Sequence, residues 1–158
     1  MYRIGFGTDI HRLIIGRPLI IGGVTIESDL GADGHSDADV LLHAVTDAVL
    51  GALALGDIGS HFPNSDERWQ NAESSKFLLY AHGLIEQRGY KVGNIDVVID
   101  LESPKIRAHI DEMRHNIASI LQIEIDQVSV KAKTGEAVDA VGERRAVRAQ
   151  AVVLLSKA

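Results

Sequence analysis

The segment that most strongly constrains the fold is SDADVLLHAVTDAVLGA, residues 36–52. Its apolar residues recur at the spacing of one helix face, at Val40, Leu41, Ala44, Val45, Ala48, Val49 and Ala52. We predict a helix from Asp37, with Ser36 as its N-cap and Asp39 in place of the usual capping-box Glu or Gln. This helix carries His43, so the way the helix packs determines which side chains lie near that imidazole.

Strands and further helices are expected on both sides of this helix. Strand patterns cover residues 2–12, 94–101, 128–133 and 147–155, and residues 18–26 have the glycine pair of a hairpin. Helices are predicted over residues 73–87 and from Pro104 onward, while residues 57–72 look irregular. This order predicts one α/β (α+β) domain over residues 1–158, with a mixed sheet of the four-stranded type, helices on one face and a small hairpin. The uncovered sheet face favours self-association as a dimer or trimer.

Composition excludes several classes of protein. The 158 residues contain no cysteine, so disulfides and thiolate zinc sites are excluded and a cytoplasmic location is expected. A net charge of −6 argues against a nucleic-acid-binding protein. No apolar run approaches the length of a membrane span, and the first residues lack the pattern of a targeting peptide.

Three residues are candidate metal ligands. Asp9 and His11 are two positions apart in a predicted strand, so their side chains point to one face. His43 can complete the set from the helix. A catalytic zinc commonly has three ligands of these types and an open fourth position, so we predict zinc here.

The start of the same helix is a candidate phosphate site. Its free N–H groups favour an anion, and His35 and Ser36 add side-chain donors. Asp39 is expected to be a structural cap. Asp47 is expected either to have a structural role or to orient His43 by accepting its second N–H.

Four ordered motifs resemble those of the 2-C-methyl-D-erythritol 2,4-cyclodiphosphate synthase family. They are Gly-x-x-x-Asp-x-His at residues 5–11, the segment HSDADVLLHAVTD at residues 35–47, the segment from Gly56 to Asp66, and Lys-Ala-Lys-Thr-Gly-Glu at residues 131–136. The resemblance runs essentially from end to end of the chain. It implies an enzyme of non-mevalonate isoprenoid biosynthesis that works as a homotrimer, with active sites between subunits.

The implied reaction closes a ring within one cytidine diphosphate substrate. The 2-phosphate of 4-diphosphocytidyl-2-C-methyl-D-erythritol 2-phosphate attacks the β-phosphorus and releases CMP. By resemblance, one zinc per subunit binds Asp9, His11 and His43, and Glu136 binds magnesium or manganese together with the substrate. His35 and Thr134 are the implied catalytic residues.

The resemblance also implies the residues that contact substrate. Asp9, His11, His35 and Ser36 surround its phosphates. The methylerythritol pocket is formed by Asp57, Ile58, Gly59, Phe62, Pro63, Asn64, Ser65 and Asp66. The nucleotide and its phosphates meet Leu101, Pro104, Lys105, Ile106, Arg107, Lys133, Thr134, Gly135 and Glu136.

The sequence departs from the family pattern in places, and two other functions fit the same ligands. Asn64 replaces a common aspartate, and Ala140, Glu143 and Arg145 alter the positions that line the family's axial cavity, so we expect weak or no binding of isoprenoid diphosphates there. A zinc phosphohydrolase would use the three ligands to activate water. A non-catalytic nucleotide-binding module would use zinc only for structure.

Overall fold

The computed structural model describes all residues, 1–158, and its centre is a mixed sheet. The strand order is β4-β1-β7-β5-β6, formed by Gly31–Ala32, Tyr2–Ile14, Ala146–Lys157, Tyr90–Asp100 and Val128–Lys133. Only the β5–β6 pair is parallel. A separate hairpin pairs β2 (Leu19–Ile21) with β3 (Val24–Ile26). The mixed sheet and the hairpin are confirmed, and the two-residue β4 adds a fifth strand to the four expected.

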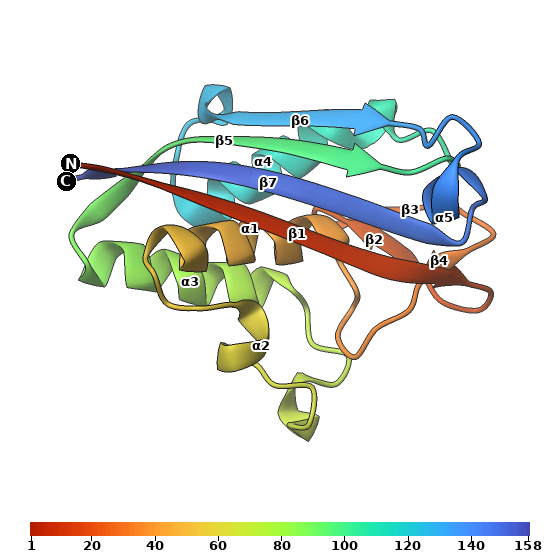
Figure 1. Ribbon diagram of the computed structural model, residues 1–158, viewed down its shortest axis with the longest axis horizontal. Coiled ribbons are helices and arrows are strands. Elements are labelled where there is room, and N and C mark those ends of the chain that lie inside the picture. Colours follow the sequence, from red (N-terminus) through yellow and green to blue (C-terminus); the bar gives the residue numbers. More distant parts are fainter.

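The three long helices lie on one face of this sheet (Figure 1). They are α1 (Val40–Ala52), α3 (Ser75–Gln87) and α4 (Ile110–Leu121). The opposite face of β1 has no helix over it, and its apolar side chains Ile4, Phe6 and Ile10 remain 72%, 61% and 53% exposed. The prediction of helices on one face is therefore confirmed. No helix in the structure combines the length and apolar character needed to cross a membrane.

Two glycines of β1 allow α1 to lie directly on the strand. A Cβ added at Gly5 would be 1.7 Å from the carbonyl oxygen of Ala48, and one added at Gly7 would be 2.1 Å from that of Ala44. Neither distance is sterically possible, so only glycine permits this approach. The close contact places the first half of α1 beside Asp9 and His11, which continue along the same face of β1.

The helix that carries His43 begins later than the sequence suggests. It begins at Val40, and its N-cap is Asp39 rather than Ser36. Ala38 has φ = 57°, a left-handed conformation that cannot continue a right-handed helix, so Asp37 and Ala38 lie outside it. The Asp39 carboxylate accepts hydrogen bonds from the backbone N–H groups of Leu42, Gly22 and Gly23 at 3.0, 2.9 and 2.7 Å.

We expect Asp39→Ala to lower the free energy of unfolding by about 3–5 kcal/mol, because three backbone donors lose their acceptor in a buried place. Asp57, the exposed N-cap of α2 (Ile58–His61), provides a matched control, since it caps a helix of four residues at the surface. Urea unfolding of both alanine variants measures the difference. Equal losses would contradict a special role for the buried cap.

Two further boundaries differ clearly from those expected, and one of them is the start of β5, at Tyr90 instead of residue 94. Pro104 was expected to open the third helix, but it lies in a loop, and α4 begins at Ile110 after a short 3₁₀ turn, Arg107–His109. The helix buries an apolar stripe that includes Met113, Ile117 and Leu121. The irregular stretch 57–72 contains α2 and a 3₁₀ turn, Glu67–Trp69. The last short helix, α5 (Asp139–Gly142), connects β6 to β7.

Candidate metal centre and active site

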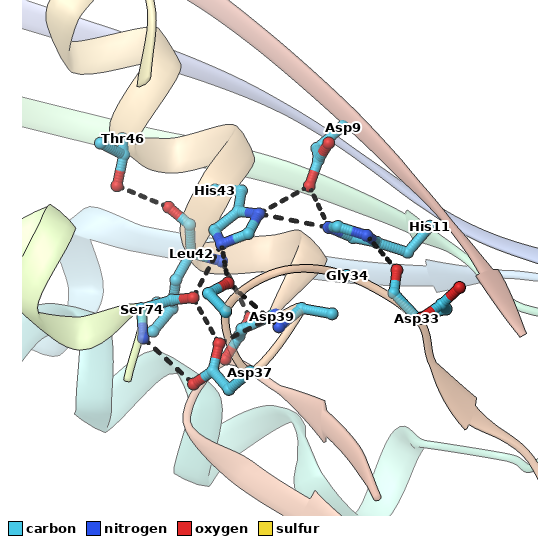
Figure 2. A network of polar contacts seen from close by, with 12 residues as sticks. Asp9, His11, Asp33, Gly34, Asp37, Asp39, Leu42, His43, Thr46 and Ser74 are labelled. Carbon is cyan, nitrogen blue, oxygen red and sulfur yellow. Dashed lines mark hydrogen bonds and ion pairs between the residues drawn. The ribbon is translucent and has the colours of Figure 1, made fainter. Parts of the chain in front are cut away.

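Three potential metal ligands converge where α1 crosses β1 (Figure 2). Asp9 and His11 come from β1, and His43 comes from the first turns of α1. The Oδ2 atom of Asp9 is 2.8 Å from Nε2 of His11 and 2.9 Å from Nδ1 of His43. The two imidazole nitrogens are 3.2 Å apart. The structure thus brings together the three residues that the spacing singled out.

The hydrogen bonds around His11 suit these residues to a cation. Nδ1 of His11 lies 2.8 Å from the carbonyl oxygen of Asp33, which can only accept, so Nδ1 carries the proton. In the neutral ring, Nε2 then presents a lone pair to the Asp9 carboxylate. Nε2 of His11 and Oδ2 of Asp9 would repel each other at this distance. A proton or a metal ion between them removes the repulsion. The observed separations are close to the edge of a tetrahedral zinc site, about 3.3 Å for bonds of 2.0–2.1 Å.

The acid–base properties of the pair agree with that geometry. Burial raises the pKa of Asp9, but hydrogen bonds and positive charge from His11 and His43 outweigh it and lower the pKa to about 2. Burial lowers the pKa of His11, but the Asp9 carboxylate outweighs it and raises the pKa above the ordinary value of 6.5. Asp9 is therefore ionised at neutral pH and favours positive charge at this point.

A cavity of about 320 Å³ opens beside the three ligands. His35 and Ser36 line it from the segment before α1, and Ile58, Gly59, Phe62 and Asn64 line it from the α2 region. Nε2 of His35 lies 3.3 Å from the carbonyl oxygen of Asp66, which ties this ring to the loop. The cavity therefore combines metal ligands, polar donors and an apolar wall.

Other predicted residues of the α2 region do not line the cavity in the single chain. The carboxylate of Asp57 accepts hydrogen bonds from the backbone and hydroxyl of Ser60, at 2.9 and 2.7 Å. The carboxylate of Asp66 forms an ion pair with Arg68 at 2.6 Å. Pro63 and Ser65 are exposed in the turn between them. The structure therefore gives the two carboxylates local partners rather than a place on the cavity wall.

The predicted nucleotide residues form a second cavity, of about 120 Å³. Its lining includes Leu101, Pro104, Lys105, Ile106, Arg107, Lys133 and Thr134. Gly135 and Glu136 follow directly, and the Thr134 hydroxyl donates to the Glu136 carboxylate at 2.9 Å. The two cavities share no lining residue within one chain. The predicted site is therefore divided into two parts.

The sequence does not indicate every residue at this site, and it leaves the role of Asp47 open between a structural role and the orientation of His43. Ser74 is not among the residues that the sequence indicates, yet its hydroxyl lies 2.8 Å from Nε2 of His43. Of the two roles expected for Asp47, the structural one is observed, because its carboxylate accepts the backbone N–H of Ile58 at 2.7 Å. Trp69 and Phe77 line the cavity without having been predicted. None of Ser74, Trp69 and Phe77 belongs to a sequence motif that would have indicated a place at the site.

Fold and site together describe a class: an α+β domain in which three residues that could bind a metal lie beside a cavity of mixed polar and apolar lining. The profile of the YgbB family matches residues 2–156. The chain belongs to the YgbB family.

Several relatives of similar length share one name. Proteins named 2-C-methyl-D-erythritol 2,4-cyclodiphosphate synthase from Synechocystis sp. and Solibacter usitatus are 54% and 51% identical to this chain over 155 residues each. The alignments cover 98% of this chain in both cases, and 96% and 98% of the relatives. A structure of the same synthase, described as a CDP-bound form, has a TM-score of 0.90 and 42% identity, and the match covers 98% of this chain and all of the other.

Proposed function

We propose that this chain is a 2-C-methyl-D-erythritol 2,4-cyclodiphosphate synthase of non-mevalonate isoprenoid biosynthesis. It converts 4-diphosphocytidyl-2-C-methyl-D-erythritol 2-phosphate into the cyclic 2,4-diphosphate and releases CMP. Membership of the family and names shared by relatives over nearly the full length support this activity. We place the enzyme in the cytoplasm. The structural observation that carries the proposal is the convergence of Asp9, His11 and His43 beside His35 and Ser36.

Asp9, His11 and His43 would hold zinc, and Glu136 would hold magnesium or manganese with the substrate. Two imidazoles and one carboxylate are a common zinc set, whereas a carboxylate acting with phosphate oxygens suits a hard cation. Bound at these places, the ions would neutralise the charge of crowded phosphates and make the β-phosphorus more electrophilic.

The chain's own residues mainly position the substrate. The attacking 2-phosphate is an anion at neutral pH, so no strong general base is needed, and alignment with the β-phosphorus is the main task. His35 and Ser36 are polar residues on the wall of the cavity that the metal ligands also line, and we assign them to the phosphates. Thr134 is assigned to the same phosphates from the second cavity, where Lys105 and Lys133 add positive charge.

The separation of the two cavities supports a trimer in which each site is shared by neighbouring subunits. The bare face of β1 supplies the apolar surface for such an assembly, through Tyr2, Ile4, Phe6 and Ile10. Light scattering of the purified protein, compared with Phe6→Asp, tests this proposal. A mass of three chains that falls on substitution supports it, whereas a monomer in both samples contradicts it.

Isotope labelling from solvent tests the proposed reaction against hydrolysis. In water enriched in ¹⁸O, attack by the substrate's own phosphate forms the new P–O bond without solvent oxygen. A zinc phosphohydrolase would instead place one ¹⁸O atom in a product. Mass spectra of CMP and the cyclic diphosphate without ¹⁸O are the expected result. A labelled linear phosphate would contradict the proposal.

Zinc affinity is expected to fall as the pH falls. Because the pKa of His11 is raised above 6.5, the protonated ring persists to higher pH than in an ordinary histidine, and at a pH below that pKa a proton must leave Nε2 before zinc binds there. Below that pKa, the affinity should decrease about tenfold per pH unit for the one proton displaced. Competition with a chelator of known affinity, at several pH values, measures the slope. An affinity independent of pH between 5.5 and 7.5, roughly one unit on each side of an ordinary histidine pKa, would contradict His11 as a ligand.

A further inference from the structure

The hydroxyl of Ser74 connects His43 to a carboxylate behind it (Figure 2). Ser74 is fully buried and lies immediately before α3. Its Oγ atom is 2.8 Å from Nε2 of His43 and forms a short hydrogen bond with Oδ1 of Asp37. His43, Ser74 and Asp37 therefore form a continuous chain that ends at the metal centre. Neither Ser74 nor Asp37 lines the cavity beside the metal ligands.

The directions of the hydrogen bonds in this chain are determined by the carboxylate. Asp37 also accepts the backbone N–H of Ser74 at 3.0 Å and that of Asp39 at 3.1 Å. Both carboxylate oxygens of Asp37 therefore act as acceptors, so the single hydroxyl proton of Ser74 points to Asp37. Oγ of Ser74 then faces Nε2 of His43 with a lone pair. Nε2 must carry the ring proton, and Nδ1 is left as the free lone pair directed at Asp9.

Backbone contacts hold this arrangement in place. The N–H of Asp37 donates to the carbonyl of Ala72 at 3.0 Å, and the N–H of Asn71 donates to the carbonyl of His35 at 2.8 Å. Two backbone hydrogen bonds thus join the segment before α1 to the segment before α3, next to the Asp37–Ser74 pair.

Ser36 is a second hydroxyl near the same nitrogen, but it fits the role less well. Its Oγ atom is 3.2 Å from Nε2 of His43 and also accepts the N–H of Ala38 at 3.2 Å. Oγ of Ser36 is thus farther from Nε2 of His43 than Oγ of Ser74 is. No carboxylate accepts the hydroxyl proton of Ser36 and fixes its direction. Its hydroxyl hydrogen is free to point elsewhere.

We propose that Ser74 and Asp37 are positioning residues that hold His43 in the Nε2–H tautomer, so that Nδ1 is the metal-binding atom. The proposal rests on the zinc site of the proposed function. Partners of this kind orient ligating imidazoles and raise their basicity, and their loss costs about 10- to 100-fold in metal affinity. Neither residue is expected to touch the substrate.

Nuclear magnetic resonance of the unaltered protein tests the tautomer directly. In protein labelled with ¹⁵N-histidine and loaded with Zn²⁺, long-range ¹H–¹⁵N spectra distinguish a protonated from a metal-bound nitrogen. The expected result is a proton on Nε2 of His43 and zinc on Nδ1. Zinc on Nε2 would overturn the proposal while leaving the metal site intact. Absence of zinc binding would overturn both the proposal and the zinc site of the proposed function.

Zinc affinities of variants test the roles of the two residues. Ser74→Ala and Asp37→Asn should each weaken zinc binding by about 10- to 100-fold. The zinc affinity of the double variant should be only slightly lower than that of the weaker-binding single variant, because both changes interrupt the same series of hydrogen bonds. Ser75→Ala removes the neighbouring hydroxyl, which has no hydrogen bond to this network, and should leave zinc affinity unchanged. Full affinity in folded Asp37→Asn protein would overturn the proposal even if Ser74→Ala failed to fold.

Discussion

His43→Ala is expected to abolish cyclodiphosphate formation while the protein remains folded. His43 supplies one of the three candidate ligand atoms of the proposed metal centre, and its side chain is largely enclosed. Without it, Asp9 and His11 cannot hold a cation firmly against the substrate phosphates. Because charge neutralisation is the main contribution expected from this centre, we expect kcat/KM to fall by at least about 10³-fold.

A second histidine provides the control for this substitution. His115 lies exposed on α4, where Nδ1 donates to the backbone carbonyl of Asp111. His115→Ala should retain the activity and the zinc content of the unaltered protein. Release of CMP and bound zinc are measured for both variants. Substantial activity in zinc-free His43→Ala protein would contradict a catalytic role for this centre.

Gly5→Ala should have the largest effect on stability. The added Cβ would overlap the carbonyl oxygen of Ala48, at 1.7 Å, and the N atom of Ala52, at 2.7 Å. Both atoms belong to the backbone of α1, so the helix must move away from β1 as a unit. We expect a loss of at least about 3 kcal/mol in the free energy of unfolding, or failure to fold.

Gly51→Ala is the matched control for this prediction. Gly51 lies in α1 near Gly5, but a Cβ there would be 3.8 Å from its nearest neighbour, the carbonyl oxygen of Phe6. Alanine favours a helix over glycine by about 1 kcal/mol, so this variant should be as stable as the unaltered protein or slightly more stable. Urea unfolding at one protein concentration compares the two. Similar stability of Gly5→Ala and Gly51→Ala would contradict the close packing of α1 on β1.

The sequence predicted those parts of the fold and site that depend on local periodicity. The i, i+2 spacing of Asp9 and His11 on a strand, and the apolar stripe around His43, were sufficient to propose the ligand set. The sheet and hairpin followed from alternation and turn residues. Motif resemblance then supplied the reaction, which periodicity alone could not.

The errors arise where long-range contacts or backbone conformation decide the outcome. The left-handed conformation of Ala38 delays the start of α1, and alanine gives no local sign of it. Ser74 lies 31 positions from His43, and no spacing rule joins them. Asp47 has the right spacing to face His43, but the nearby N–H of Ile58 competes successfully for its carboxylate. The hydrogen-bond partners of His43 are therefore determined by tertiary packing and not by local spacing in the sequence.

Phosphorus NMR of the unaltered protein with its proposed substrate tests the central claim most directly. The sample contains 4-diphosphocytidyl-2-C-methyl-D-erythritol 2-phosphate, Zn²⁺ and Mg²⁺. We expect the substrate signals to be replaced by those of CMP and a cyclic diphosphate in equal amounts. Folded, zinc-loaded protein that leaves the substrate unchanged, or that yields only linear phosphates, would contradict the account.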